Sequence, residues 1–179
     1  TGETGSGKDT VAGYLVERGF IHYSLSDVIR ERLREQGKPV DREHAIAMGN
    51  ALREKHGDAV LAVEILKMIE TGSDYVVTSI RHPAEVDALK QHPEFALVKI
   101  NTPQHLRYER WVQRQNASRP TEHLTFAEFQ TLDAREYEGG VHGQNLRACM
   151  EMANDVIMND VSKDVLKERV ARILEKLKR

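Results

Sequence analysis

Three glycines and a lysine within the first ten residues constrain the fold more than any other feature of this chain. The segment Thr1-Gly-Glu-Thr-Gly-Ser-Gly-Lys-Asp-Thr10 runs into Val11-Ala-Gly-Tyr-Leu15, whose apolar spacing predicts a helix. The glycines let the backbone turn so that successive N–H groups point inward, and the helix start adds its positive end. Lys8 follows at the spacing that reaches the terminal phosphates of a bound nucleotide. We therefore expect a nucleotide site lined by Gly2, Glu3, Thr4, Gly5, Ser6, Gly7, Lys8, Asp9 and Thr10.

Two details of this loop concern metal binding and the strand before it. A loop of this type usually has serine or threonine directly after the lysine, whereas here Asp9 takes that place and the hydroxyl follows at Thr10. Asp9 and Thr10 are accordingly the candidate ligands for a Mg²⁺ ion that accompanies the phosphates. Because the sequence begins at the loop itself, we expect the strand that normally leads into such a loop to lie before residue 1.

Short apolar runs alternate with longer helical stretches along the rest of the chain. Residues 75–80, 95–100 and 155–159 have the apolar, partly β-branched composition of buried strands. Apolar residues at three- and four-residue spacing predict helices over 11–18, 27–36, 42–71, 83–91, 103–115, 125–137 and 162–178. Strands that alternate with helices indicate a parallel sheet covered on both faces. The expected fold is therefore a single three-layer α/β domain over residues 1–179.

Composition excludes several other classes of protein. The 26 Lys and Arg residues nearly cancel the 28 Asp and Glu residues, so the overall charge gives little support for a nucleic-acid binder. The single cysteine, Cys149, excludes an internal disulfide and a multi-cysteine zinc site, and it favours a reducing, cytoplasmic setting. No apolar run approaches the ~18 residues that span a bilayer. We expect a cytoplasmic protein with small-molecule nucleotide substrates and without nucleic-acid or membrane partners.

Several segments resemble the P-loop nucleoside monophosphate kinases. Ser24-Leu-Ser-Asp-Val-Ile-Arg30 is similar to the adenylate kinase stretch whose arginine grips the phosphate of the acceptor nucleotide. Val77-Thr-Ser-Ile-Arg-His-Pro83 stands where that family has a second acceptor arginine, and residues 100–114 resemble the strand and helix that lead into the kinase lid. The resemblance implies a P-loop NTPase fold with a helical acceptor-binding insertion around 25–69 and a short lid around 114–137. It places Asp27, Arg30 and Arg81 at the acceptor, and Arg110 and Arg114 at the lid.

Other segments resemble two related groups. Residues 79–86, 49–57 and 153–160 are similar to the kinase-like P-loop domain that occurs alone or fused to deoxycytidylate deaminases. The last of these segments also resembles the end of dephospho-coenzyme A kinase. Since ligands collect beyond the carboxyl ends of parallel strands, we expect Asn159 and Asp160 to border the donor base.

The positive side chains of these segments suit phosphoryl transfer, which needs aligned substrates and neutralised charge more than covalent help from the protein. Arginine binds phosphate through a planar fork and keeps its proton. Arg107, Arg110 and Arg114 fall on one face of the predicted helix, where they would close over the phosphates. The expected catalytic residues are Lys8, Arg81, Arg110 and Arg114, and Arg110 also belongs to the ATP site. Thr78 stands where adenylate kinase has a strand-end aspartate that helps order Mg²⁺.

These observations support one principal hypothesis and two alternatives. We expect Mg²⁺-dependent transfer of the ATP γ-phosphate to a nucleoside or deoxynucleoside monophosphate. Dephospho-coenzyme A kinase is the enzymatic alternative, and it requires a general base for which Asp27 is the nearest candidate. The second alternative is a nucleotide-sensing module that regulates a partner such as a deaminase without turnover. Thr78 favours the sensor, and the set of arginines disfavours it.

Overall fold

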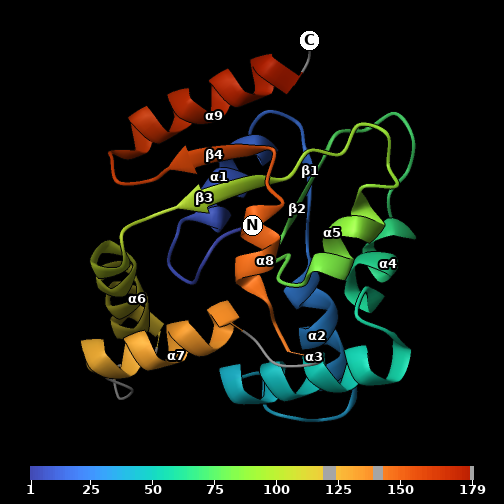
Figure 1. The fold of residues 1–179 in the computed structure, drawn as a ribbon, viewed down its shortest axis with the longest axis vertical. Coiled ribbons are helices and arrows are strands. Elements are labelled where there is room, and N and C mark those ends of the chain that lie inside the picture. Colours follow the sequence, from blue (N-terminus) through green and yellow to red (C-terminus); the bar gives the residue numbers. More distant parts are fainter. Residues whose placement is uncertain (119–123, 139–142, 178–179) are drawn as a thin grey trace.

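The computed structural model describes residues 1–118, 124–138 and 143–177, which form an α/β structure (Figure 1). In chain order the elements are α1 (Lys8–Val16), β1 (Ile21–Ser24), α2 (Leu25–Glu35), α3 (Arg42–His56), α4 (Val60–Leu66), β2 (Tyr75–Thr78), α5 (Pro83–Leu89), β3 (Val98–Asn101), α6 (Gln104–Ser118), α7 (Phe126–Glu138), α8 (Leu146–Glu151), β4 (Asp155–Met158) and α9 (Lys163–Leu177).

The described strands form two parallel pairs. In the first pair β1 lies beside β2, with Ile21 opposite Tyr75, and in the second β3 lies beside β4, with Val98 opposite Asp155. Thr1 lies between the pairs, because its nitrogen donates to the Val98 carbonyl at 2.8 Å and its hydroxyl donates to the Ile80 carbonyl at 2.7 Å. The glycine loop therefore starts between the two strand pairs, where the N label lies in Figure 1.

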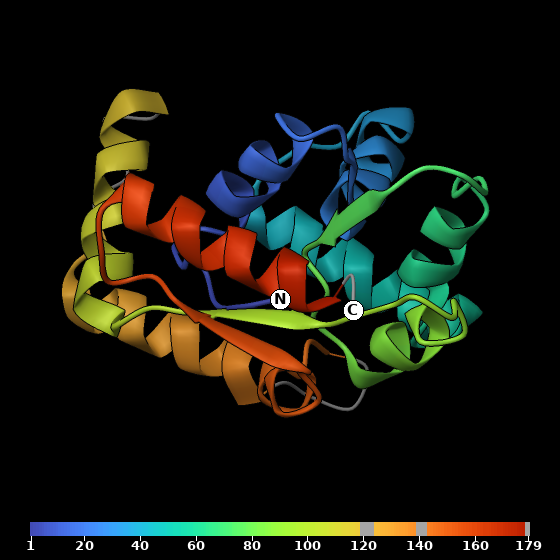
Figure 2. The same cartoon turned by 90° about the horizontal axis from the view of Figure 1, so that it is seen from above.

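Helices cover both faces of the strands. Figure 2 shows α1 and α9 on one side of β3 and β4, with α7 and α8 on the other. The first side is packed by one apolar cluster from α1, β3, β4 and α9: Val11, Leu15, Ile100, Ile157, Leu166 and Val170. A larger cluster joins α2, α3, α4, α5 and α8 and includes Leu25, Leu33, Met48, Leu61, Ile65, Val86, Leu89, Leu146 and Cys149. This parallel arrangement with helices on two faces confirms the expected fold class.

Three elements differ from the sequence prediction. The helix expected over 42–71 is two helices, because Gly57 adopts φ 93° and ends α3 one turn before α4 begins. Strand β1 was not predicted, since its four residues include an exposed isoleucine and histidine and lack an apolar run. Helix α8 was also missed. It is only six residues long and begins where the Asn145 side chain accepts a bond from Ala148 N–H.

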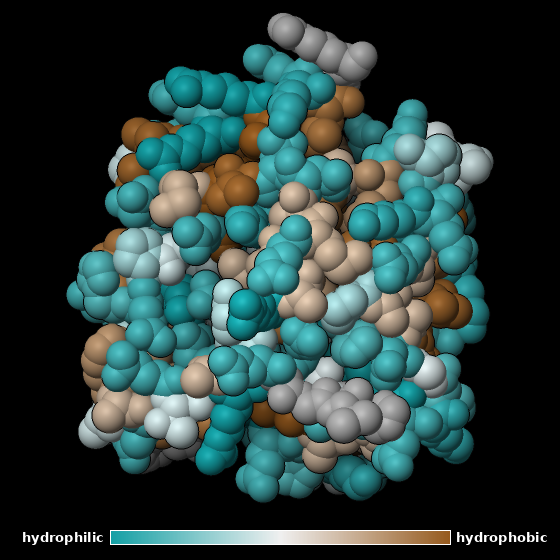
Figure 3. Space-filling view, viewed as in Figure 1, coloured by the Kyte–Doolittle hydropathy of each residue, from teal (hydrophilic) through white to brown (hydrophobic). Residues whose placement is uncertain are grey.

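Figure 3 shows that hydrophilic side chains dominate the face seen in Figure 1, with hydrophobic ones gathered toward its upper part, over β4 and α9. Val156 and Met158 of β4 and Val165 of α9 are among the exposed apolar residues. Among the described residues, no helix combines the length and apolar character that crossing a bilayer requires.

Candidate active site

The glycine loop passes so close to its neighbours that side chains would not fit. At Gly5, where φ is 82°, a Cβ atom would lie 2.6 Å from the carbonyl oxygen of Arg107. At Gly7, where φ is 96°, it would lie 2.2 Å from Nδ2 of Asn159. Positive φ and close approach are both conditions that only glycine meets without strain. The glycine spacing read from the sequence is thus a requirement of this backbone.

The loop leads directly into the start of α1. Gly7 is the N-cap and provides no side-chain hydrogen bond, and the first backbone bond of the helix runs from Val11 N–H to the Gly7 carbonyl. The N–H groups of Lys8, Asp9 and Thr10 therefore precede the helical ladder. They form a cradle of donors at the positive end of the helix, which fits a phosphate group.

The Lys8 side chain folds back onto the loop. Its Nζ atom donates to the carbonyl oxygens of Gly2, at 2.6 Å, and Glu3, at 2.8 Å. Burial, together with the positive charge of Arg81, lowers the pKa of Lys8 to about 7. In the free protein the Lys8 ammonium therefore loses its proton far more readily than an exposed lysine does. A negatively charged ligand bound beside Nζ would raise the pKa again and favour the protonated form.

This pKa predicts proton uptake on nucleotide binding. At pH 8 the Lys8 amine is mostly neutral in the free protein, because its pKa is about 7. A triphosphate beside Nζ favours the charged form, so binding of a non-hydrolysable ATP analogue should take up about one proton more in the wild type than in Lys8→Met. Calorimetry in two buffers of different ionisation enthalpy measures that difference. The excess should shrink at pH 6, where Lys8 is already charged; equal uptake by both proteins at pH 8 would contradict the assignment.

Arg107 of α6 forms a brace that holds the loop from inside. From the sequence we expected this side chain to close over the phosphates, because it shares a predicted helix face with two other arginines of α6. Its side chain is 3% exposed and makes a double ion pair with Asp133 of α7, at 2.6 Å for each bond. It also donates to the Glu3 carboxylate at 2.8 Å and to the carbonyls of Thr4 and Thr102. These contacts engage all five donors of the guanidinium. Arg107 is therefore occupied by the protein itself.

Loss of this brace should destabilise the protein. Arg107→Lys keeps the charge but lacks the planar fork, so it leaves Asp133 buried with an incomplete set of partners. We expect the free energy of unfolding to fall by about 3 kcal/mol or more in urea denaturation. Arg32→Lys is the matched control, because Arg32 lies exposed in an ion pair with Glu35 on α2. Equal unfolding midpoints for Arg107→Lys and the control would show that the brace contributes little.

A second charged cluster lies against the first half of the loop. Glu136 of α7 accepts bonds from the Thr4 hydroxyl at 3.0 Å, from Arg81 Nη1 at 3.1 Å and from Arg42 Nη2 at 2.6 Å. Arg81, which follows β2, also donates to Oε1 of Gln144 at 2.7 Å. Burial acts to raise the pKa of Glu136, but the guanidiniums of Arg81 and Arg42 prevail and hold it below its usual value. The structure thus places Arg81 near the loop through Glu136, and it adds Arg42, which was not singled out from the sequence.

Arg110 and Asn159 meet at the other half of the loop. Asn159 Nδ2 donates to the Ser6 carbonyl at 2.7 Å, and Arg110 Nη2 donates to the Asn159 carbonyl at 3.0 Å. Arg110 Nη1 and Ser6 Oγ are buried without a hydrogen-bond partner in the described part of the chain. Orphaned donors beside a cradle of N–H groups fit phosphate oxygens. The structure therefore brings together the loop, Arg110 and Asn159.

Arg114, Asp9 and Thr10 lie on the exposed rim of the site. Arg114 Nη1 is 4.0 Å from Asp9 Oδ2, and these side chains are 56% and 78% exposed. Thr10 is exposed as well. Over the described ranges, no group of three or more His, Cys, Asp or Glu is placed to hold a metal ion. Asp9 and Thr10 carry oxygen atoms of the kind that Mg²⁺ binds.

The remaining predicted residues lie away from these contacts. Asp27 and Arg30 form an ion pair of 2.5 Å with each other on the exposed side of α2. Asp160 pairs with Arg169 at 3.1 Å on the surface. The expected lid, 114–137, corresponds to the end of α6 and most of α7, with residues 119–123 outside the described ranges.

The end of β2 carries hydroxyl groups in place of a carboxylate. The Thr78 hydroxyl lies 2.9 Å from Nε2 of His22, and Ser24 donates to the Ser79 hydroxyl at 3.0 Å. Ser79 has φ 64°, an unusual value for a residue other than glycine. Such strain is typical of functional positions, here between β2 and Arg81.

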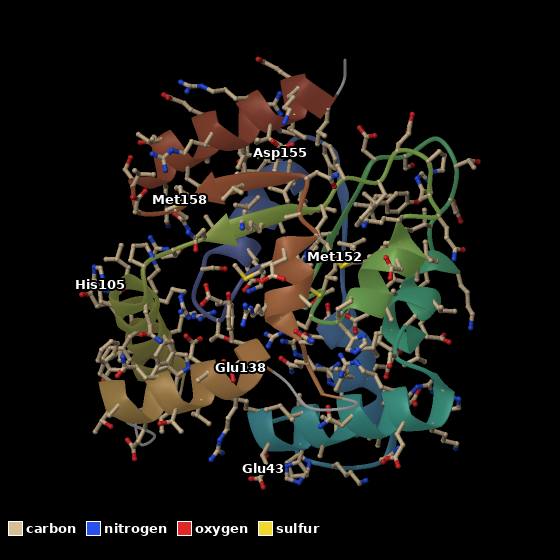
Figure 4. All side chains as sticks on the ribbon, viewed as in Figure 1. Glu43, His105, Glu138, Met152, Asp155 and Met158 are labelled. Carbon is tan, nitrogen blue, oxygen red and sulfur yellow. The ribbon has the colours of Figure 1, made fainter. Side chains whose placement is uncertain are left out.

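Figure 4 shows side-chain nitrogen and oxygen atoms gathered between the loop, α6, α7 and α8, with Glu138 marking the end of α7 beside α8. The site is thus a polar space built from segments that are distant in the sequence. Its donors come from the loop, α3, α6 and the segment after β2, and its buried carboxylates include those of Asp133 and Glu136 on α7.

Known proteins are similar to this chain in amino-acid sequence. Residues 1–125 match the family model described as an AAA domain. The UPF0200 protein of Pyrobaculum aerophilum is 30% identical over 179 residues, covering 99% of this chain and 95% of that protein. A UPF0200 protein of Thermococcus gammatolerans is also 30% identical, over 99% of this chain and 93% of the relative.

Solved structures share the fold. Shikimate kinase from Acinetobacter baumannii, in complex with shikimate, superposes with a TM-score of 0.57 at 19% identity, over 98% of this chain and 90% of that one. TT1252 from Thermus thermophilus has the same TM-score, 0.57, at 22% identity, over 98% and 94% of the two chains. At such identities the likeness establishes a P-loop kinase fold and leaves the substrate open.

Proposed function

Because this chain belongs to the UPF0200 family and its AAA domain has a P-loop kinase fold, we propose that it transfers the γ-phosphate of ATP to a nucleoside or deoxynucleoside monophosphate. The main support is that positive groups lie at both halves of the loop, with Lys8 Nζ and Arg81 near its first half and Arg110 near its second half. Two phosphate-bearing substrates that meet at the loop need this division of charge.

The donor is held by the loop. The N–H groups at the start of α1, with Lys8, would bind the terminal phosphates of ATP, and the orphaned Nη1 of Arg110 would bind a phosphate oxygen near Gly7. Asn159 and Asp160 follow β4 and would border the base. Asp9 and Thr10 would hold a Mg²⁺ ion, which would supply positive charge that neutralises the phosphates. Arg114, on the rim beside Asp9, would stabilise the group in transfer.

The acceptor is held on the side of Arg81. The Arg81 guanidinium lies beyond the end of β2, and open α/β sheets bind their ligands beyond such strand ends. A monophosphate attacks through an oxygen that is already anionic, so no general base is needed, whereas a coenzyme hydroxyl requires one. Asp27, the candidate base, is exposed and paired with Arg30 on α2. This position favours a monophosphate acceptor over dephospho-coenzyme A.

The test is ADP formation from Mg-ATP by the full-length protein. Nucleoside and deoxynucleoside monophosphates and dephospho-coenzyme A are screened in parallel, with Lys8→Ala as the blank. Turnover with a monophosphate, lost in the blank, is the expected result. Turnover with dephospho-coenzyme A alone would replace the acceptor and keep the chemistry.

A nucleotide-sensing role is the second candidate, and the end of β2 favours it. Thr78 contributes a hydroxyl bonded to His22 where an aspartate would help to order Mg²⁺. The same screen separates the two functions. A sensor binds the non-hydrolysable ATP analogue tightly and forms no ADP with any acceptor.

A further inference from the structure

Glu136 lies between the phosphate loop, which is the proposed donor site, and Arg81 of the proposed acceptor site. Its carboxylate bonds to Thr4, a residue of the phosphate loop, and to Arg81, the proposed acceptor arginine. Arg42, at the start of α3, reaches the same carboxylate with two donors, Nε at 3.1 Å and Nη2 at 2.6 Å. The Glu136 side chain is 8% exposed and comes from α7, a different element from any of its partners.

The charges around Glu136 do not balance. Two guanidiniums, on Arg42 and Arg81, share the one carboxylate of Glu136. Arg81 Nε is in addition buried without a hydrogen-bond partner in the described part of the chain. A phosphate dianion would match the two guanidiniums more fully, in charge and in the number of acceptor oxygens, than one carboxylate does.

We propose that the Glu136 carboxylate occupies, in the free protein, the anion subsite that Arg42 and Arg81 form for the acceptor phosphate, and that the acceptor binds by displacing it. This inference rests on the proposed function, since it specifies how the acceptor of that reaction is bound. It adds Arg42 to the acceptor site and assigns Glu136 as the internal competitor of the substrate.

Displacement of a carboxylate selects the chemical class of the acceptor. A neutral sugar or alcohol offers no charge to exchange for Glu136, and a carboxylic acid merely replaces one monoanion with another. A phosphate monoester carries nearly two negative charges and gains the most from two planar guanidiniums. Its binding also releases the Thr4 hydroxyl, so occupation of the acceptor subsite alters the donor loop directly.

Inorganic phosphate is a suitable probe of this subsite, because it needs no turnover. The loop is first saturated with a non-hydrolysable ATP analogue, and phosphate is then titrated by calorimetry, with acetate as a monoanionic comparison. Glu136→Gln should bind phosphate about tenfold more tightly than the wild type, because the competing charge is gone and the subsite is open in most molecules. Arg42→Gln should bind it about tenfold more weakly. Acetate should bind poorly to every variant.

Glu35→Gln and Arg32→Gln are the matched controls, because these two side chains form an exposed ion pair on α2 and should leave phosphate affinity unchanged. Glu136→Asp is a second variant that keeps the charge on a shorter arm; it should give intermediate tightening and remains informative if Glu136→Gln folds poorly. Weaker phosphate binding in Glu136→Gln and Glu136→Asp would overturn the proposal and make Glu136 a residue that positions the arginines. Failure of the ATP analogue to bind would instead count against the proposed function, and the variant differences in phosphate affinity would still be measured.

Discussion

Replacing Lys8 with alanine should lower kcat/KM for phosphoryl transfer by about a thousandfold. Lys8 follows the last glycine of the loop, and its Nζ lies on the carbonyls of Gly2 and Glu3, from which it can turn toward a bound triphosphate. Without the Lys8 ammonium, the negative charge on the transferred phosphoryl group loses a stabilising positive charge in the transition state. Initial-rate measurements of ADP formation, with ATP and acceptor varied separately, give kcat and both KM values.

The stability of Lys8→Ala should remain close to that of the wild type, because burial of this ammonium is unfavourable, as its pKa of about 7 shows. Lys90→Ala, at an exposed position after α5, is the control for loss of a lysine. A Lys8→Ala protein that keeps the wild-type kcat and only binds ATP less tightly would show that Lys8 holds the donor without assisting transfer.

Replacing Gly5 with alanine should cost about 3 kcal/mol of folding free energy and abolish binding of the ATP analogue. The added Cβ atom would lie 2.6 Å from the backbone carbonyl of Arg107, and φ at this position is 82°. Because the obstructing atoms belong to the Arg107 backbone and not to a flexible side chain, the loop must move away from α6. Urea denaturation and calorimetric binding measure the two effects.

Gly13→Ala is the matched control for this substitution, because it adds the same methyl group eight residues later, inside α1, where nothing lies within 4 Å. There alanine should raise the free energy of unfolding by about 0.5 to 1 kcal/mol through its helix propensity. The two variants are therefore expected to shift stability in opposite directions. Similar losses in both would show that the loop geometry is not the cause.

The phosphate loop could be predicted because its constraint is local. Positive φ at Gly5 and Gly7 and the helix start at Lys8 are properties of neighbouring residues, and the sequence displays them directly. Arg81 and Asn159 could be assigned to strand ends because each follows a short apolar run, β2 or β4, and ligands collect beyond the carboxyl ends of parallel strands.

The partners of the arginines could not be predicted, because they come from distant segments. Arg107 and Arg110 occupy the same predicted helix face. Yet the donors of Arg107 are all engaged by Asp133, Glu3 and two carbonyls, whereas Nη1 of Arg110 is unpartnered among the described residues. Likewise, Arg30 matches a family motif but lies with Asp27 on the surface, whereas Arg42 reaches Glu136 because of how α3 packs. Periodicity gives the face of a helix, and only tertiary packing shows what lies opposite.

The Arg107 brace has a consequence for native-state fluctuations. One guanidinium joins the loop, through Glu3 and Thr4, to α7, through Asp133. Local unfolding that frees α7 therefore also loosens the loop, and the two should open as one cooperative unit in hydrogen exchange. A ligand that orders the loop would, by the same connection, slow amide exchange in a helix on the other side of the brace.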